Sequence, residues 1–261
     1  MILSHKHRFI FLHCRKTAGS SICVSLARVL GPDDLQLSGL QESFEAGIAT
    51  PARVLREAKD ELKSGGGSLK DRLALEGLLG GARQNKAMIR LIKAHYEPRL
   101  GARPQHAHAS ELRACFPEEW ERYAKFCVVR NPWDKTVSDY FWRTKGRSDP
   151  PSFERFVHAL RDGDELGGMV LPEYHDNWPL YTIDDRIVAD RVVRFETLAE
   201  DLKDTCAALD IPFDGWLPRA KGSYRPKSGK TGDTRSLYTP ELQRIVGTLY
   251  EKEIEAFGYT F

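Results

Sequence analysis

The sequence predicts an α/β fold in which a central parallel sheet is flanked by helices. Three times along the 261-residue chain, a short apolar run is followed by a loop and then by a segment with helical periodicity. Each run is uninterrupted, as is typical of strands buried on both faces of a parallel sheet. The composition, with 41% hydrophobic and 29% charged residues, is that of a folded globular chain. We expect a single domain spanning residues 1–261.

The first unit starts at the apolar run Phe9–Leu12 and continues into the small-residue loop 14–21. A helix follows, and Gly31 and Pro32 end it. The apolar positions that are spaced for one face of this helix are Ile22, Leu26, Val29 and Leu30.

The other two units lie in the second half of the chain, with strands predicted over residues 126–129 and 191–195. Threonine caps and a proline at the first helical position indicate where helices begin. The residues that mark the helix starts here are Pro132, Thr197 with Glu200 as a capping box, and Thr239 with Pro240 in a final helix.

Between the first two units, residues 33–103 show weak helical periodicity and carry no motif that indicates chemistry. Glycines at 65–67 and at 80–81 divide this segment into pieces. We expect a helical insertion that serves as a lid or as a wall of the substrate site.

Charge, apolar runs and cysteines exclude several classes of function. The net charge of +2 gives no overall field that would attract nucleic acid. No apolar run approaches the ~20 residues that cross a bilayer. The polar, basic start of the chain lacks a signal-peptide core, so we expect a cytoplasmic protein. The spacing of the five cysteines fits neither a zinc site nor a disulfide framework, which favours buried free thiols.

The loop 14–21 has the composition of an anion site. The N–H groups of residues 18–21 open a helix, where unpaired donors and the helix dipole attract a phosphate, and Lys16 adds a positive charge. This favours a P-loop-like three-layer fold. The lysine precedes the glycine, however, unlike the G-x-x-x-x-G-K-[ST] order of ATPases and GTPases. The alternative is an ordinary turn with a surface lysine.

The loop after the second strand offers another anion contact. Arg130 lies where open α/β sheets bind ligands, and its guanidinium can hold a phosphate through two hydrogen bonds. Lys135 and Ser138 are three residues apart on the next helix, so we expect them to share a face and to add two donors. The alternative is a structural arginine paired with Asp134.

Together these segments resemble the sulfotransferases that use 3′-phosphoadenosine 5′-phosphosulfate (PAPS), particularly the carbohydrate-type branch. Residues 16–21, Lys-Thr-Ala-Gly-Ser-Ser, are similar to the family's 5′-phosphosulfate loop, with a serine for the commoner threonine. Residues 129–133, Val-Arg-Asn-Pro-Trp, followed by Ser138, are similar to its 3′-phosphate segment. Residues 227–233 resemble the basic loop that closes over the nucleotide, although Thr234 stands where a tryptophan is common.

The resemblance implies a role for each matching residue. Lys16 would contact the sulfuryl group and the oxygen that bridges it to the 5′-phosphate, leaving 3′-phosphoadenosine 5′-phosphate (PAP) as the product. The PAPS-binding residues that it implies are Arg15, Lys16, Thr17, Ala18, Gly19, Ser20 and Ser21 around the 5′-phosphosulfate, and Arg130, Ser138, Lys227, Ser228 and Gly229 around the 3′-phosphate.

An acceptor hydroxyl must lose a proton during transfer, so a base is expected. His106 fits the position of the family's histidine best, and His108 is the second choice. For at least one of the two, packing or capping is the alternative. A second alternative is a zinc site formed by these two histidines with His95 as a third ligand. No hydrolase-like pattern completes such a site, and we expect no metal.

The leading hypothesis is in-line transfer of a sulfuryl group to a hydroxyl of a carbohydrate or glycan. A phenol, a lipid or a small metabolite is the alternative acceptor. A nucleotide kinase-like phosphotransferase is a second class, which would need a lysine after the glycines and a magnesium carboxylate. A third class is a non-catalytic nucleotide-binding module, which would tolerate loss of Lys16 and His106.

Overall fold

A computed structural model of the chain describes residues 1–168, 176–218 and 234–261. Contacts divide these residues into two compact units. The sheet unit comprises Met1–Cys14, Ala18–Val128 and the described residues of Pro179–Ala220. The helical unit comprises Arg15–Thr17 and the described residues of Val129–Trp178 and Lys221–Phe261.

The sheet unit contains, within its described residues, a five-stranded sheet with the order β3-β1-β2-β4-β7. β2 and β4 are parallel. β1 is antiparallel to both β2 and β3, so β2, β3 and β4 point in one direction. The α/β class is therefore confirmed, but the sheet is mixed rather than wholly parallel. The strands are β1 (Ile2–Ser4), β2 (Phe9–Leu12), β3 (Leu35–Gln36), β4 (Ala124–Val129) and β7 (Arg191–Arg194).

The start of the chain forms strand β1, whereas the sequence indicated a polar, basic segment there. Met1, Ile2 and Leu3 are buried, and a turn over residues 5–8 returns the chain into β2 as a hairpin. Three apolar residues are too few to show a periodicity, and the basic turn after them dominates the local composition. The reversed strand is thus a feature that local patterning does not reveal.

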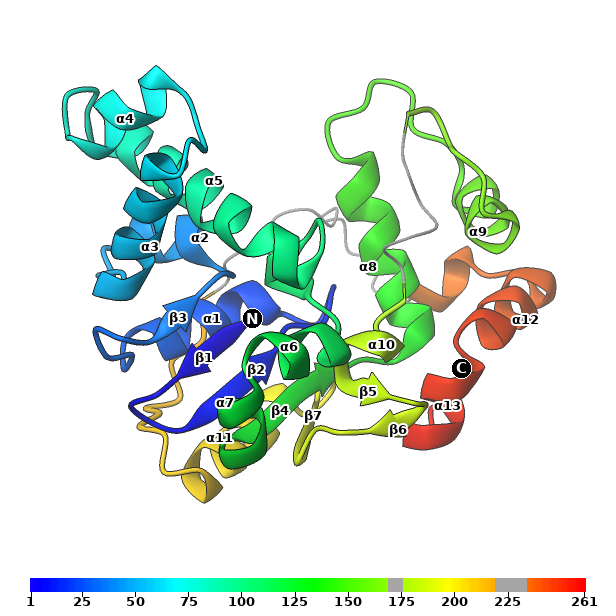
Figure 1. Cartoon of the computed structure of the whole chain (residues 1–261). Coiled ribbons are helices and arrows are strands. Elements are labelled where there is room, and N and C mark those ends of the chain that lie inside the picture. Colours follow the sequence, from blue (N-terminus) through cyan, green and yellow to red (C-terminus); the bar gives the residue numbers. More distant parts are fainter. Residues whose placement is uncertain (169–175, 219–233) are drawn as a thin grey trace. The chain divides into compact units, whose positions relative to one another are not determined.

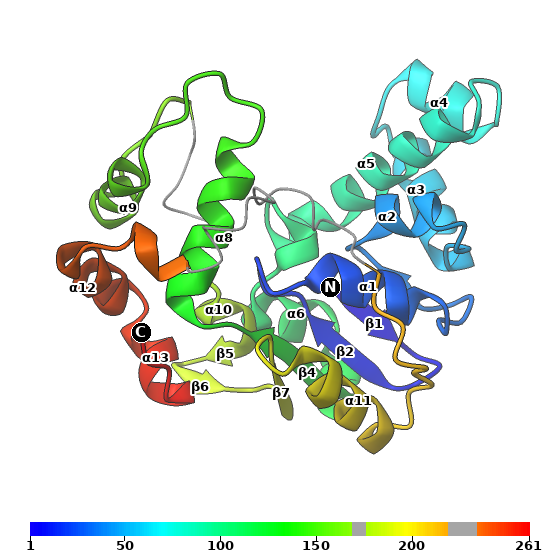
Figure 2. The same cartoon turned by 180° about the vertical axis from the view of Figure 1, so that it is seen from behind.

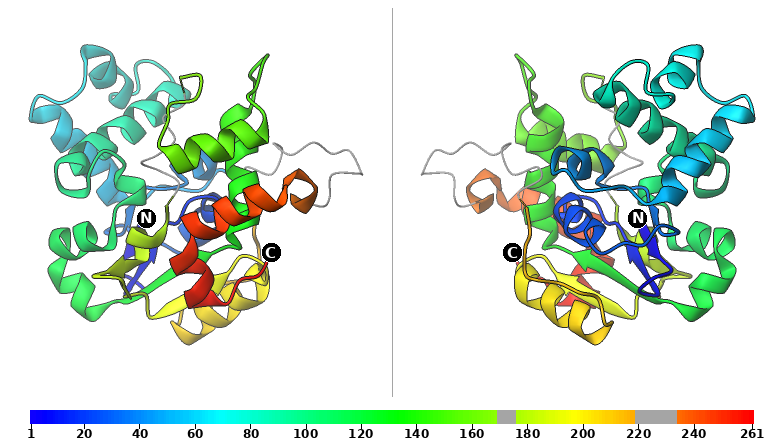
Figure 3. Two further views of the ribbon diagram at one scale, coloured as in Figure 1. Left: turned by 90° about the vertical axis from the view of Figure 1, so that its right-hand side faces the viewer. Right: turned by 90° about the vertical axis from the view of Figure 1, so that its left-hand side faces the viewer.

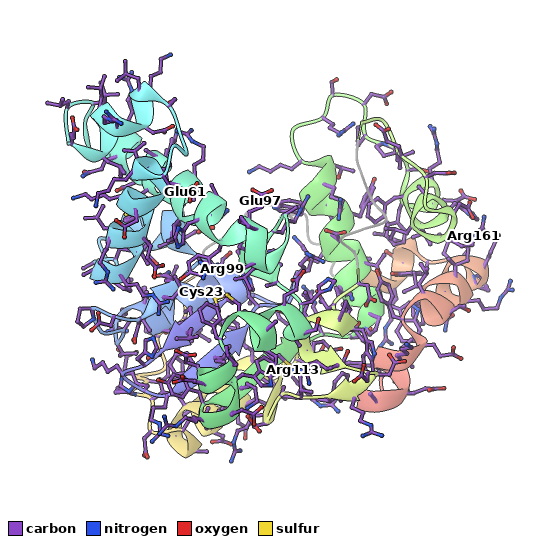
Figure 4. The ribbon with its side chains drawn as sticks, viewed as in Figure 1. Cys23, Glu61, Glu97, Arg99, Arg113 and Arg161 are labelled. Carbon is purple, nitrogen blue, oxygen red and sulfur yellow. The ribbon has the colours of Figure 1, made fainter. Side chains whose placement is uncertain are left out.

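Helices cover both faces of the sheet. In Figure 1, α6 (Ala109–Cys115) and α7 (Pro117–Arg122) lie over one face. Figure 2 shows α1 (Gly19–Ala27) and α11 (Leu198–Ala208) over the other face, where α11 packs against β7. Cys23 of α1 is labelled in Figure 4. The core on the α1 side consists of Ile2, Phe9, Phe11, Ile22, Cys23, Leu26, Phe126, Val128, Val193, Leu202, Cys206 and Ile211.

The strands are buried on both faces, as the uninterrupted apolar runs predicted. Alternate residues of β2 point to opposite faces, and Phe9 and Phe11 belong to the core on the α1 side. Ile10 and Leu12, which point the other way, are also buried. Helix α1 ends at Ala27, earlier than its apolar pattern suggested.

The segment 33–103 is helical, and its glycines separate its helices. It contains α2 (Leu40–Glu45), α3 (Ala52–Lys63), α4 (Leu69–Leu75) and α5 (Gly81–Leu100). α3 packs against α5 and against the edge strand β3 (Figure 1). The lid or wall that we expect of this segment stays a prediction.

The helical unit contains α8 (Pro132–Thr144), α9 (Phe153–Asp162), α12 (Pro240–Leu249) and α13 (Glu251–Phe257). α12 packs against α8, α9 and α13, and α12 and α13 are the orange and red helices of Figure 3. The Asn131 side chain accepts a hydrogen bond from Trp133 N at 3.1 Å, and Thr239 accepts one from Leu242 N at 3.2 Å. Both helices begin where the sequence predicted.

Smaller elements complete the described chain. α11 starts after Thr197 as predicted, but without a side-chain cap from that residue, so the capping box is not formed. All five cysteines are free. Within the described ranges, no helix combines the length and the apolar character that spanning a bilayer requires. The remaining elements are the 3₁₀ helices Pro104–His106 (η1) and Thr234–Leu237 (η4), α10 (Trp178–Tyr181), β5 (Thr182–Ile183) and β6 (Arg186–Ile187).

Candidate functional site

Two loops leave the sheet at the carboxyl ends of neighbouring parallel strands. β2 ends at Leu12 and β4 ends at Val129, and the register sets Leu12 opposite Cys127. The loop 13–18 and Arg130 therefore start from the same edge of the sheet, which is where open α/β sheets bind ligands.

In the helical unit, Arg130 contacts the loop directly. Its Nη1 donates a hydrogen bond to the carbonyl oxygen of Lys16 at 3.1 Å. Arg130 is buried, and Ser138, on α8, is half-buried. Lys16 and Arg130, which the resemblance implied at opposite ends of one nucleotide, thus lie in one unit and in contact.

Asn177 holds the loop from the other side, and sequence analysis did not identify it. Arg15 N donates to Asn177 Oδ1 at 2.9 Å, and Asn177 Nδ2 donates to the Arg15 carbonyl at 3.0 Å. Asn177 is 1% exposed, and Arg15 Nη1 also donates to the Asp176 carbonyl at 3.3 Å. The partners are 162 residues apart along the chain, so no local pattern points to them.

The Lys16 side chain lies over an exposed aromatic ring. Its Nζ is 5.1 Å from the ring centroid of Trp142 on α8, a cation–π contact, and Trp142 is 44% exposed. Lys16 itself has φ 63, the left-handed region that a non-glycine side chain disfavours. Arg130 holds the Lys16 carbonyl and Asn177 holds the preceding residue. Such over-determined backbone strain is characteristic of functional sites.

In the sheet unit, α1 begins without an acidic or capping side chain. Its N-cap is Ala18, in the left-handed region with φ 61, and no acidic residue lies in the first turn. Ile22 N donates to the Ala18 carbonyl at 3.2 Å, so helical hydrogen bonding starts there. The N–H groups of Gly19, Ser20 and Ser21 have no acceptor within the helix, which leaves a positive helix end at this turn.

The His13 ring occupies the space beside Gly19. A Cβ atom on Gly19 would lie 2.0 Å from Cδ2 and Nε2 of His13. No side chain fits at that separation, so only glycine lets the helix start so close to the imidazole.

Replacement of Gly19 by alanine is therefore expected to push the His13 ring aside and to destabilise the protein. Overpacking of a buried site costs about 1–3 kcal/mol. Thermal unfolding measures this, with Gly81→Ala as the matched control. Gly81 is also the first residue of its helix, and a Cβ atom there meets nothing within 4 Å. Equal melting temperatures for the two variants would contradict the close contact.

His106, the preferred candidate base, lies against His13. Its Nδ1 is 2.8 Å from the His13 carbonyl oxygen, and the two ring centroids are 4.5 Å apart. A carbonyl oxygen only accepts hydrogen bonds, so Nδ1 of the neutral ring carries the proton and Nε2 carries the lone pair. His106 is half-buried, at the end of η1. This tautomer suits proton acceptance at Nε2.

His108 has a different place. It is exposed and precedes α6, where its backbone N–H donates to Glu111 Oε2 at 2.7 Å. The capping alternative therefore fits His108 through its backbone, whereas His106 lies beside the loop residue His13.

Two residues of α8 near Ser138 are structural. Lys135 is 3% exposed, and its Nζ donates to Glu253 Oε2 at 2.9 Å, so the expectation that it adds a donor beside Ser138 is wrong. Tyr140 donates its hydroxyl hydrogen to the Pro151 carbonyl at 2.9 Å. Burial raises the pKa of Tyr140, so its hydroxyl stays protonated at neutral pH.

The described part of the chain contains no candidate metal site. No group of three or more His, Cys, Asp or Glu side chains there could hold an ion. His95 instead lies on α5, with Nδ1 3.4 Å from Glu61 Oε2. Three residues that the resemblance implied at the 3′-phosphate lie outside the described residues, namely Lys227, Ser228 and Gly229.

Comparison with known proteins identifies the family. A model described as the sulfotransferase family matches residues 1–260. An uncharacterized protein of Archaeoglobus fulgidus is 29% identical over 94 residues, which are 36% of this chain and 72% of that protein. No solved structure matches the chain at a significant level. Because the family model spans almost the whole sequence, this chain belongs to the sulfotransferase family.

Proposed function

We propose that the chain transfers a sulfuryl group from PAPS to an acceptor hydroxyl, with Lys16 as the catalytic cation and His106 as the base. Family membership supports sulfuryl transfer in general. The observation that carries the finer assignment is the contact between Arg130 Nη1 and the Lys16 carbonyl, 3.1 Å long. This contact between Arg130 and the Lys16 backbone supports the proposal that both residues bind one nucleotide.

The residues at the two loops fit a doubly phosphorylated nucleotide. Lys16 presents an ammonium group from a loop whose backbone is held by Asn177 and Arg130. The first turn of α1, in the sheet unit, has no acidic side chain and no side-chain cap. Arg130 and Ser138 supply a guanidinium and a hydroxyl for the 3′-phosphate.

PAPS supplies the sulfuryl group and a nucleotide leaving group, and the chain supplies alignment and charge. Lys16 stabilises the negative charge that grows on the oxygen between sulfur and the 5′-phosphate as that bond breaks. His106 Nε2 takes the proton of the acceptor hydroxyl as its oxygen bonds to sulfur. The acceptor leaves as a sulfate ester and the nucleotide leaves as PAP.

A carbohydrate or glycan is the acceptor class that we propose. Trp142 is 44% exposed, and the centroid of its ring lies 5.1 Å from Lys16 Nζ. Indole faces offer an apolar surface with little conformational entropy to lose, which suits the flat face of a sugar ring. A labelled-sulfate transfer screen over sugars, glycans, phenols and lipids tests this class. Transfer to phenols or lipids alone would overturn it.

Replacement of Arg130 by alanine is expected to weaken PAP binding about 10- to 100-fold. Hydrogen bonds to charged groups contribute about 1.5–3 kcal/mol, and 1.4 kcal/mol is about tenfold in affinity. Affinity for adenosine 5′-phosphate, which lacks the 3′-phosphate, should change little. Calorimetric titration of both nucleotides measures the difference.

The matched control is Arg161→Ala, which removes an arginine that is paired with Asp162 on the outer part of α9 (Figure 4). It should leave both affinities unchanged. If Arg130→Ala weakened both nucleotides equally, Arg130 would act only through the Lys16 backbone. Unchanged PAP affinity would remove Arg130 from the site altogether.

A further inference from the structure

We propose that His13 is a positioning residue that orients His106 for proton transfer. The inference rests on the proposed role of His106 as the base. No sequence pattern gave a role to His13, which directly follows the apolar run Phe9–Leu12.

The His13 ring is fixed on its Nδ1 side by Ser38. Nδ1 is 2.6 Å from Ser38 Oγ, and that hydroxyl donates its hydrogen to the Gln105 carbonyl at 3.0 Å. The α-amino group of Met1 also donates to Ser38 Oγ, at 2.6 Å. Because the serine hydrogen is used, His13 Nδ1 carries a proton and donates it to Ser38.

Packing fixes the plane of the same ring. The ring stacks on Phe11, with centroids 5.8 Å apart and planes inclined by 22°. Its other edge lies against Gly19, where a Cβ atom would come within 2.0 Å. His13 is buried, so both its hydrogen bond and its orientation are held.

His13 and Ser38 together hold two consecutive residues, Gln105 and His106. Ser38 bonds the Gln105 carbonyl, and the His13 carbonyl accepts the His106 Nδ1–H at 2.8 Å. The two imidazole rings are 4.5 Å apart, inclined by 44°. The His13 backbone thus selects the His106 tautomer, and the His13 ring limits how His106 can turn.

This arrangement matters because a histidine base must present the correct nitrogen. A carbonyl or carboxylate on one ring nitrogen sets which nitrogen accepts the proton. Loss of such an orienting partner at metal-bound histidines typically costs about 10–100-fold in activity. We expect the same order of loss when the His13 ring no longer holds its place.

The test compares His13→Phe with Ser38→Ala. The phenylalanine ring can still stack on Phe11, but it cannot donate to Ser38. Each variant should lower kcat about tenfold or more, while PAP affinity and acceptor KM stay within about twofold. Both variants remove the hydrogen bond between His13 Nδ1 and Ser38, which helps to hold the His13 backbone whose carbonyl selects the tautomer. Nitrogen NMR of the labelled His106 ring should therefore change from one Nδ1–H tautomer to a mixture. His158→Phe, on α9, is the control and should change none of these.

The outcomes separate this inference from the proposed function. If His106→Ala loses activity but folded His13→Phe and Ser38→Ala keep full kcat and a single His106 tautomer, His13 has no positioning role. If the wild-type protein transfers no sulfuryl group, the proposed function fails, and the NMR comparison still decides whether His13 sets the His106 tautomer. Should His13→Phe fail to fold, Ser38→Ala gives the same decision.

Discussion

Lys16→Ala is expected to lower kcat for sulfuryl transfer by about 10²–10³-fold, the usual effect of removing one group that stabilises developing charge. PAP affinity should fall much less, because Arg130 and Ser138, the proposed ligands of the 3′-phosphate, remain. The substitution exchanges one left-handed non-glycine residue for another, so the backbone strain at φ 63 is retained. Transfer of labelled sulfate, measured beside a PAP titration, separates the two quantities.

The control for Lys16→Ala is Lys63→Ala, which removes an exposed lysine paired with Asp60 on α3. It should retain normal kcat and normal PAP affinity. Lys16→Arg keeps the positive charge and should recover part of the rate. Full activity of Lys16→Ala would exclude the lysine from the transfer step.

His106→Ala should lower kcat by about 10²–10⁴-fold, the contribution of a general base. PAP affinity should be unchanged, since His106 is assigned to the acceptor proton. A base works only while it is unprotonated, so the wild-type rate should fall on acidification, and the variant should lose this fall. The pH profile of kcat measures both effects.

His108→Ala is the internal control for the base. Its backbone N–H donates to Glu111 of α6, and alanine keeps this hydrogen bond, so stability and rate should stay close to the wild type. If His108→Ala were the inactive variant and His106→Ala the active one, the assignment of the base would be reversed. Thermal unfolding of both variants shows whether a loss of rate reflects a loss of fold.

The elements that sequence patterning found are those with a strong local signal. Phe9–Leu12 and residues 126–129 are long enough to show a buried strand, and Pro132 and Pro240 mark the starts of α8 and α12. β1 is too short for such a signal. Its pairing with β2 depends on a hairpin rather than on its own composition.

In the candidate site too, the sequence predicted some features and missed others. Proximity of Lys16 and Arg130 followed from a general rule, since both come after parallel strands that are neighbours in the sheet. Asn177 and Ser38 act through hydrogen bonds to residues that are distant in sequence. No spacing rule identifies such partners.

Lys135 shows why a shared helical face is an incomplete argument. Spacing of three placed it beside Ser138, but its ammonium pairs with Glu253, which is 118 residues away along the chain. A buried lysine needs a charged partner, so the tertiary contact decides where its side chain points. Ser138 is uncharged and needs no charged partner, and its side chain is half-buried.

The proposal that two cationic loops bind one nucleotide is tested most directly by a crystal structure of the protein with PAP. The 5′-phosphate should lie against the Lys16 ammonium, and the 3′-phosphate should accept hydrogen bonds from Arg130 and Ser138. A nucleotide bound away from Lys16 and Arg130, or one whose 3′-phosphate faces solvent, would contradict the account.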